Sequence, residues 1–244
     1  MPLIETAHHV LALLDLTRLD VSDSPEQMRQ FCQTAMTDYG PVAAVCIDPE
    51  CVAVASEVLA GQPVNIASVA NFPQGWPDPE RAKKEIMQIA RDGGDEVDVV
   101  FPWRNALDGD LNAGADLVSG CKSRCGNQIT LKVILETGEL QDAALIYRAS
   151  RVALDAGADF IKTSTGKRDQ GATLSAAEAM LRAIADHGDG GIKISGGVKT
   201  VAEADAYLSV IRQTLGADWI SAKTVRIGAS GLLNDVMTVL HQGE

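Results

Sequence analysis

The stretch Asp155-Ala-Gly-Ala-Asp-Phe-Ile-Lys162 decides the fold class, because it joins the end of a helical pattern to the start of a strand. Glycine is favoured just after a helix C-terminus, since it adopts the left-handed backbone conformation without strain. Similar junctions, Asp92-Gly-Gly-Asp95 and Leu215-Gly-Ala-Asp218, stand before other apolar runs. This repetition predicts a chain in which helices alternate with strands.

Outward from this stretch, short apolar runs rich in β-branched residues recur about every 30 residues, with helical patterns such as Ala143–Leu154 between them. Strands that alternate with helices form a parallel sheet, and eight such units in roughly 250 residues match a (β/α)8 barrel. An open doubly wound sheet is the alternative. The expected strands are Leu13–Thr17, Ala43–Ile47, Asn65–Asn71, Glu96–Phe101, Thr130–Glu136, Phe160–Ser164, Gly191–Ser195 and Thr224–Gly228.

The whole chain, residues 1–244, is expected to form one α/β domain, a single TIM barrel with a short N-terminal helix. Barrels of this length occur as single domains, and a hydrophobic content of 46% is enough for a large core. We find no linker and no low-complexity stretch. The Pro-rich segment Asn71–Pro79 is expected to form a long loop after the third strand.

Composition and charge exclude several classes of partner. A formal net charge of −12 repels nucleic acid backbones and anionic membranes. The segment Met1–Val10 is not expected to be a signal peptide, and no apolar run approaches the roughly 20 residues that span a bilayer. The five cysteines, an odd number, indicate reduced thiols and a cytoplasmic location.

Charged residues interrupt four consecutive expected strands, at Asp98, Lys132, Lys162 and Lys193. Side chains alternate along a strand, so these charges face the side opposite to their apolar neighbours and point into the barrel. Unpaired buried charges are costly, so acidic and basic members must neutralise one another. A structural ion-pair cluster is the alternative, but barrel enzymes carry their reactive groups at such strand ends.

Two buried lysines suit Schiff-base chemistry. A lysine attacks a carbonyl only as the free amine, and both burial and a neighbouring cation lower its pKa. Lys162 and Lys193 are expected on adjacent strands, where one can be the nucleophile and the other the cation that tunes it. Asp98 can then transfer protons, directly or through water. The residues alone leave open which lysine is the nucleophile.

Glycine-rich turns follow the last three expected strands, at Gly166-Lys167, Gly196-Gly197 and Gly228-Ala-Ser-Gly231. Barrels commonly bind phosphate with these loops and a helix N-terminus, where backbone N–H groups point at the anion. Ser230 is expected to cap the following helix and to donate a hydrogen bond to phosphate. Ordinary turns are the alternative interpretation.

Several motifs together resemble the deoxyribose-phosphate aldolase family, a family of class I aldolases. The resemblance runs from about residue 10 to the helix after Ser230, in the same order. The motif around Lys162 is the most specific of them. The motifs are Asp15-Leu-Thr17, Asn71-Phe-Pro73, Glu96-Val-Asp98-Val-Val, Lys132-Val-Ile-Leu-Glu-Thr-Gly138, Phe160-Ile-Lys162-Thr-Ser-Thr-Gly-Lys167 and Lys193-Ile-Ser-Gly-Gly197.

The resemblance implies reversible cleavage of 2-deoxy-D-ribose 5-phosphate to acetaldehyde and D-glyceraldehyde 3-phosphate, without a metal or another cofactor. It implies that Lys162 forms the Schiff base, that Lys193 tunes it and that Asp98 relays protons. It also implies a set of substrate-binding residues. These are Thr17, Lys132, Gly166, Lys167, Gly196, Gly197, Ser230 and Gly231.

The sequence departs from the family pattern in two places. Family members often end in a tail with a tyrosine implicated in proton transfer, whereas this chain ends in His241-Gln-Gly-Glu244. Some members also have two serines where this chain has Ser230-Gly231. The first difference concerns the route of proton transfer, and the second concerns phosphate affinity and substrate range.

Three rival interpretations remain: a Schiff-base aldolase for another phosphosugar, a non-catalytic phosphosugar-binding barrel and a metal-dependent aldolase. The last is disfavoured, because the chain's histidines lie away from the expected strand ends. The histidines are His8, His9, His187 and His241.

Cys46 is expected to be a buried apolar residue; the alternative is a thiol that reaches the mouth. The expected partners are a phosphosugar and aldehydes, with no nucleic acid and no membrane, and a homodimer is compatible with the sequence.

Overall fold

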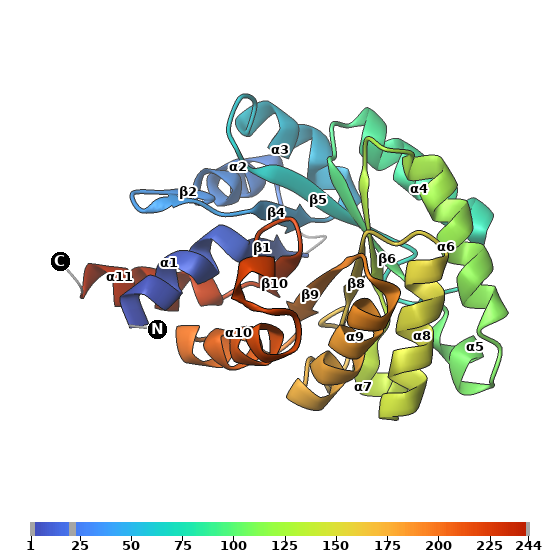
Figure 1. The fold of residues 1–244 in the computed structure, drawn as a ribbon. Coiled ribbons are helices and arrows are strands. Elements are labelled where there is room, and N and C mark those ends of the chain that lie inside the picture. Colours follow the sequence, from blue (N-terminus) through green and yellow to red (C-terminus); the bar gives the residue numbers. More distant parts are fainter. Residues whose placement is uncertain (1–2, 20–22, 243–244) are drawn as a thin grey trace.

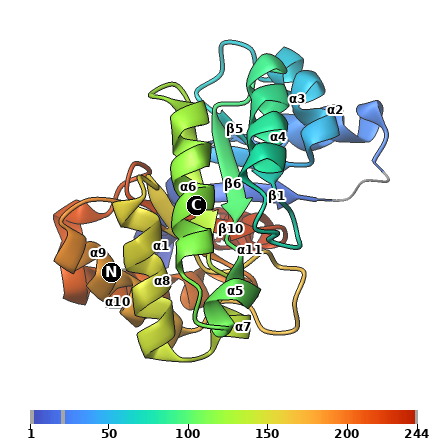
Figure 2. The same cartoon turned by 90° about the vertical axis from the view of Figure 1, so that its right-hand side faces the viewer.

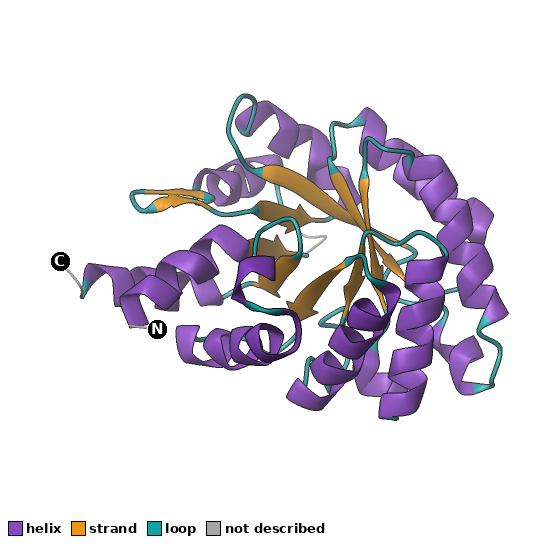
Figure 3. Cartoon of the chain, in the orientation of Figure 1, coloured by secondary structure: helices purple, strands orange, loops and turns teal. Residues whose placement is uncertain are grey.

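The computed structural model describes residues 3–19 and 23–242. Eight parallel strands close into a barrel, and the helices lie around its outside (Figure 1; Figure 3). The first strand pairs with both the second and the last barrel strand, which confirms the TIM barrel and rules out the open sheet. The strands are β1 Leu14–Arg18, β4 Ala44–Ile47, β5 Asn65–Ala70, β6 Glu96–Val100, β7 Thr130–Ile134, β8 Phe160–Lys162, β9 Gly191–Ser195 and β10 Val225–Ala229.

Every expected strand is present within a few residues of its predicted bounds. Most of the differences are at the C-terminal ends, where β7 and β8 stop earlier than the apolar pattern suggests. After β7 the backbone turns at Glu136, which has a φ of 57° and so leaves the extended conformation. A short antiparallel hairpin of β2 Met36–Thr37 and β3 Gly40–Pro41 was not expected, because strands this short show no alternation of polarity.

Helices cover the barrel wall, and the expected N-terminal helix is present. Figure 2 shows α4, α6 and α8 along one side of the barrel, where α6 packs against both of its neighbours. None of the described helices is both long and apolar enough to cross a membrane. The helices are α1 Leu3–Leu13, α2 Pro25–Gln33, α3 Val52–Val58, α4 Pro79–Arg91, α5 Trp103–Leu107, α6 Asn112–Cys125, α7 Thr137–Leu140, α8 Ala143–Asp155, α9 Leu174–His187, α10 Val201–Leu215 and α11 Leu232–His241, with 3-10 turns at Pro49–Cys51 and Ala217–Trp219.

The glycine junctions behave as the sequence predicts. Gly157, just after α8, has a φ of 99°, and its N–H donates to the carbonyl of Leu154 at 2.9 Å. Gly93, after α4, has a φ of 96°. L-residues with side chains rarely adopt these angles, so the glycines end the helices and turn the chain into the next strand.

Alternation along the strands separates an apolar outer face from a charged interior. Val97 and Val99 on β6, which flank Asp98, are fully buried in the apolar core between strands and helices. Asp98 is paired in register with Lys132, and Lys162 with Lys193. The four charges predicted to point inward therefore lie on neighbouring strands of the barrel.

Candidate active site

The barrel interior holds a network of seven charged side chains, all at most 5% exposed. Most of the barrel strands contribute to it: β7 to β10 carry the basic groups, and β1 and β6 carry the carboxylates. We call this set the interior charge network. Its members are Asp15, Glu96, Asp98, Lys132, Lys162, Lys193 and Arg226.

Asp98 is the centre of the network near the active-site end. Its Oδ2 accepts hydrogen bonds from Nζ of Lys162 and Nζ of Lys193, both at 2.7 Å, and its Oδ1 accepts one from Nζ of Lys132 at 3.0 Å. Burial raises the pKa of the Asp98 carboxyl, but the three ammonium groups together hold it well below its usual value. Asp98 is therefore a carboxylate at neutral pH.

Lys193 and Lys132 are each held by more than one carboxylate. Nζ of Lys193 ion-pairs with Asp15 at 2.5 Å as well as with Asp98, and Nζ of Lys132 ion-pairs with Glu96 at 2.5 Å. Burial lowers the pKa of Lys193, but the two carboxylates raise it well above its usual value. Burial also lowers the pKa of Lys132, but Asp98 and Glu96 raise it, and the net effect is a rise. Both lysines therefore remain cations.

Lys162 differs from these two lysines. Within the described residues its ammonium contacts one carboxylate, Asp98, which it shares with Lys132 and Lys193. It also lines a cavity at the end of the barrel, and neither Lys132 nor Lys193 is among the described residues that line this cavity. Lys162 can therefore reach a bound molecule, and it has the fewest carboxylate partners of the three lysines. The geometry favours Lys162 over Lys193 as the nucleophile, the choice that the sequence left open.

The cavity, of about 280 Å³, opens at the C-terminal ends of β1, β8, β9 and β10. We call it the mouth cavity. It brings together the expected catalytic lysine and all but one of the expected substrate-binding residues, and its volume is near the lower end of the range for ligand pockets. The expected residues that line it are Thr17, Lys162, Gly166, Lys167, Gly196, Gly197, Ser230 and Gly231.

Lys132 is the expected residue that does not fit its assignment. Its side chain is 0% exposed and lies among Glu96, Asp98 and Asp15, outside the mouth cavity as formed by the described residues. The structure therefore does not bring Lys132 to the mouth cavity, and its contact with substrate stays a prediction. Alternation along β7 predicted that this side chain points into the barrel, but it did not predict how far the side chain lies from the mouth.

The loop between β8 and α9 is held by Glu136, a residue that the sequence motif contained but that was not assigned to the site. Glu136 accepts hydrogen bonds from the Thr165 N–H at 3.1 Å and the Thr165 Oγ1 at 2.6 Å. Thr165 Oγ1 in turn accepts from the Lys167 N–H at 3.1 Å. Burial raises the pKa of Glu136, although the Thr165 hydrogen bonds oppose the rise. This chain of bonds fixes the turn at Gly166, whose φ is 77°.

Ser230 does not cap the following helix. α11 begins at Leu232, and Gly231 takes the N-cap position with no side-chain cap hydrogen bond. Ser230 stands one residue too early to reach the first free N–H groups of the helix. Its exposed side chain lines the mouth cavity instead, so its expected role as a hydrogen-bond donor to a ligand remains a prediction.

Gly228 has a role that the sequence did not assign. A Cβ at this position would lie 2.9 Å from Cε of Lys193, too close for either side chain to stay in place. Glycine on β10 therefore leaves the space in which Lys193 reaches Asp15 and Asp98.

Cys46 on β4 is fully buried, with its Sγ 3.9 Å from Oδ2 of Asp98. Burial raises the pKa of this thiol, with Lys193 opposing the rise. The position fits the expected buried residue and not a thiol at the mouth.

The expected independence of metal stays a prediction. The chain end Gly243-Glu244 lies outside the described residues.

Three members of the network, Asp15, Glu96 and Arg226, were missing from the predicted site, although the same sequence signal identifies them. Asp15 stands between Leu14 and Leu16, and Arg226 stands between two apolar residues of β10. Glu96 is two residues before Asp98 and shares its face of β6. The alternation that identified the lysines therefore applies to these residues too.

Comparisons with known proteins agree with this geometry. The sequence profile of the DeoC/LacD aldolase family matches residues 9–236. A candidate deoxyribose-phosphate aldolase from Toxoplasma gondii ME49, in its apo form, is 26% identical, with a TM-score of 0.90 and coverage of 99% of each chain. One from Coccidioides immitis is 25% identical, with a TM-score of 0.83, covering 95% of this chain and 86% of that one.

A more distant structure shares the fold. The deoxyribose phosphate aldolase from Aeropyrum pernix, which forms a tetramer, is 24% identical to this chain, with a TM-score of 0.78. The alignment covers 97% of this chain and 96% of that one. The family match spans every strand that contributes to the interior charge network.

Proposed function

Because this chain belongs to the DeoC/LacD family of aldolases, we propose that it reversibly cleaves 2-deoxy-D-ribose 5-phosphate to acetaldehyde and D-glyceraldehyde 3-phosphate through a Schiff base on Lys162. The observation that carries this proposal is the position of Lys162. Its Nζ lies 2.7 Å from Asp98 and faces a cavity whose walls include three glycine-containing loops. An amine, a carboxylate and an anion-binding rim are the groups that this reaction needs.

The reaction starts with the neutral amine of Lys162, which adds to the aldehyde carbon of the open-chain sugar; loss of water gives an iminium. The bond between C2 and C3 then breaks and its electron pair moves toward the iminium, forming an enamine. The C3 hydroxyl loses its proton and becomes the aldehyde of D-glyceraldehyde 3-phosphate. Protonation of the enamine at C2, followed by hydrolysis, releases acetaldehyde and restores the amine.

The interior charge network supports the charged intermediate. An iminium on Lys162 carries a positive charge beside the carboxylate of Asp98, which Lys132 and Lys193 hold in place. A fixed carboxylate stabilises a developing positive charge without having to reorient. We further propose that Asp98 passes protons to the reacting atoms through water.

The phosphate group of the substrate is expected to matter for catalysis as well as for binding. We expect 2-deoxy-D-ribose, which lacks the phosphate, to show a kcat/KM about thirtyfold lower or worse, a loss of ~2 kcal/mol in charge-assisted hydrogen bonds. Steady-state kinetics with both sugars measure the ratio. The control is Lys167→Met, because Lys167 lines the mouth cavity. Loss of its charge should reduce the difference in kcat/KM between the phosphorylated and the unphosphorylated sugar. Equal kcat/KM values in the wild type would mean that these loops are only turns.

Removal of metal ions, in contrast, is expected to leave the activity unchanged. We expect full activity after exhaustive treatment with EDTA, because the iminium replaces a metal ion as the electron sink. Cleavage of 2-deoxy-D-ribose 5-phosphate is followed by coupled detection of D-glyceraldehyde 3-phosphate. Loss of activity that Zn²⁺ restores would place the protein among the metal-dependent aldolases.

The same assay distinguishes the remaining rivals. A Schiff-base aldolase for another phosphosugar would give a higher kcat/KM with that sugar, and a non-catalytic binding barrel would give no turnover. We further propose a cytoplasmic location, supported by five free cysteines. A homodimer stays a prediction from the sequence, and light scattering would test it.

A further inference from the structure

The interior charge network contains unequal numbers of acidic and basic groups. Three carboxylates face four basic groups, so the set carries one excess positive charge when every member is ionised. A net charge buried in a protein interior is costly, and the network becomes neutral when one basic group loses its proton. The composition of the network therefore favours one free amine inside the barrel.

The contacts identify which group loses the proton. Lys193 and Lys132 each ion-pair with at least two carboxylates, and Arg226 contacts Asp15 and Glu96. Among residues 3–19 and 23–242, Lys162 has one carboxylate partner, Asp98, and Asp98 has two other lysine partners. Lys162 is therefore the member whose deprotonation costs the least, and it is the member at the mouth cavity.

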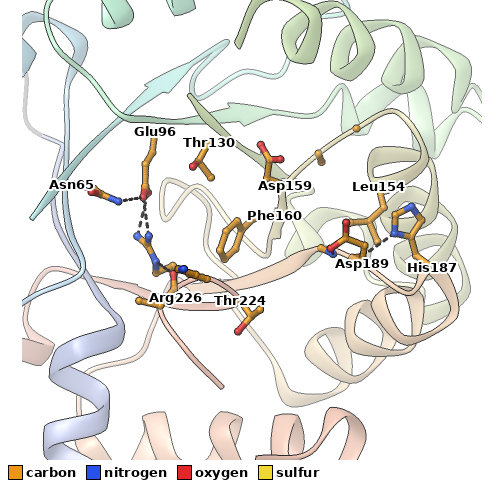
Figure 4. Close-up of a pocket in the computed structure, with 15 residues that line it drawn as sticks. Asn65, Glu96, Thr130, Leu154, Asp159, Phe160, His187, Asp189, Thr224 and Arg226 are labelled. Carbon is orange, nitrogen blue, oxygen red and sulfur yellow. Dashed lines mark hydrogen bonds and ion pairs between the residues drawn. The ribbon is translucent and has the colours of Figure 1, made fainter. Parts of the chain in front are cut away.

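Arg226 occupies the opposite end of the network. It lines a cavity of about 480 Å³ that lies at the N-terminal ends of β5 to β10, together with Asn65 and Glu96 (Figure 4). Its guanidinium donates to Asp15 Oδ1 and to Glu96 Oε1, both at 2.7 Å. We call this the base cavity. Arg226 is not among the described residues that line the mouth cavity.

We propose that Arg226 is a positioning residue that keeps the amine of Lys162 unprotonated from the far end of the barrel, by supplying the excess positive charge of the interior network. This inference rests on the proposed Schiff-base function of Lys162. Without Arg226, three carboxylates would face three lysines, and the network would be neutral with Lys162 protonated. The arginine would thus determine the protonation of a residue that it does not touch.

Arginine suits this role better than lysine does. A guanidinium keeps its proton at every physiological pH, and its fork of donors can hold two carboxylates at once. Burial lowers the pKa of Arg226, but Asp15 and Glu96 raise it further above its already high value. A lysine at this position would add a fourth titratable amine to the network, and that amine could lose its proton in place of Lys162.

The buried titratable groups beside Lys162 and Arg226 keep a constant charge near neutral pH. Burial raises the pKa values of Asp15 and Glu96, but the surrounding cations lower them below their usual values, so both stay ionised. Burial raises the pKa of Cys46, so its thiol stays neutral. The charged groups at the two cavities face water, which screens them. They are Lys167 and Lys199 at the mouth cavity and Asp159, His187, Asp189 and Lys223 at the base cavity.

The test measures the rate at which acetaldehyde and a hydride reductant trap the imine, as a function of pH. For Arg226→Met we expect the alkaline rise of this rate to move up by about one pH unit, which makes trapping about tenfold slower at neutral pH. Glu96→Gln removes a negative charge and should move the rise to lower pH. The double variant, Arg226→Met with Glu96→Gln, should return it toward the wild-type position.

Two controls separate charge from structure. Lys223→Met removes an exposed cation from the base cavity and should leave the profile unchanged. Arg226→Ala opens space beside the base cavity, and millimolar guanidinium should move its profile back toward that of the wild type. Urea, which has a similar shape and no charge, should not. A purely structural role for Arg226 predicts a lower Tm with no shift in any of these profiles.

The outcomes distinguish this inference from the function on which it rests. An unchanged profile in Arg226→Met, with the adduct still on Lys162, would overturn the positioning role alone. No wild-type adduct on Lys162 would overturn the proposed function itself. If Arg226→Met does not fold, the test uses Glu96→Gln. A shift of the alkaline rise of the trapping rate to lower pH supports the inference, and an unchanged pH dependence contradicts it.

Discussion

Lys162→Ala is expected to lower kcat/KM for 2-deoxy-D-ribose 5-phosphate by about 10⁴-fold or more, equivalent to ~5.4 kcal/mol of transition-state stabilisation. The reason is that the iminium forms on this amine, and the other lysines of the network remain charged. Lys193 is held as a cation by Asp15 and Asp98, so it cannot replace the lost nucleophile. Steady-state kinetics and single-turnover measurements with the purified variant check the loss.

The fold is expected to survive this substitution. Without Lys162, Asp98 keeps its contacts with Lys132 and Lys193, and the interior network holds equal numbers of carboxylates and basic groups. Lys162→Met, which retains the apolar stem, should therefore have a Tm close to or above that of the wild type. An active Lys162→Ala variant, or inactivity explained by unfolding, would count against the assignment.

The second large effect is expected from Lys193→Met. The ammonium of Lys193, on the adjacent strand β9, shares Oδ2 of Asp98 with Lys162 and so places a positive charge beside that amine. Removing its charge should move the alkaline rise of activity to higher pH and lower activity at neutral pH about a hundredfold. The pH dependence of kcat/KM measures the shift, and activity should recover in part as the pH rises.

A structural role for Lys193 predicts a different result. Asp15 and Asp98 would each lose an ion-pair partner, which costs several kcal/mol when the charges are buried and lowers the Tm. Both effects are expected together, so Tm and the pH profile must be measured on the same preparation. Normal activity per folded molecule with an unchanged profile would defeat the tuning role of Lys193.

Local patterns in the sequence were enough to predict the barrel and the charges inside it. The glycine junctions and the apolar runs predicted every barrel strand, and alternation predicted that Asp98, Lys162 and Lys193 face inward. These features depend on neighbours in the chain, since helix ends and strand faces are set locally. The short hairpin of β2 and β3 was missed, because it is too short for any pattern.

Depth inside the barrel and the count of ion pairs could not be predicted. Alternation gives the face of a strand on which Lys132 lies, but the stagger between strands determines how far it is from the mouth. For the same reason, the sequence did not show that Arg226 and Asp98 belong to one network. The choice between Lys162 and Lys193 required the contacts of each amine, which come from strands far apart in the chain.

The central claim is that Lys162 is the amine that becomes covalently bonded to substrate. Treatment with acetaldehyde and borohydride, followed by proteolysis and mass mapping of the peptides, tests it most directly. We expect one reduced N-ethyl adduct, on the peptide that contains Lys162, and no adduct in Lys162→Ala. An adduct found only on Lys193 or Lys132, or no adduct with saturating acetaldehyde, would contradict it.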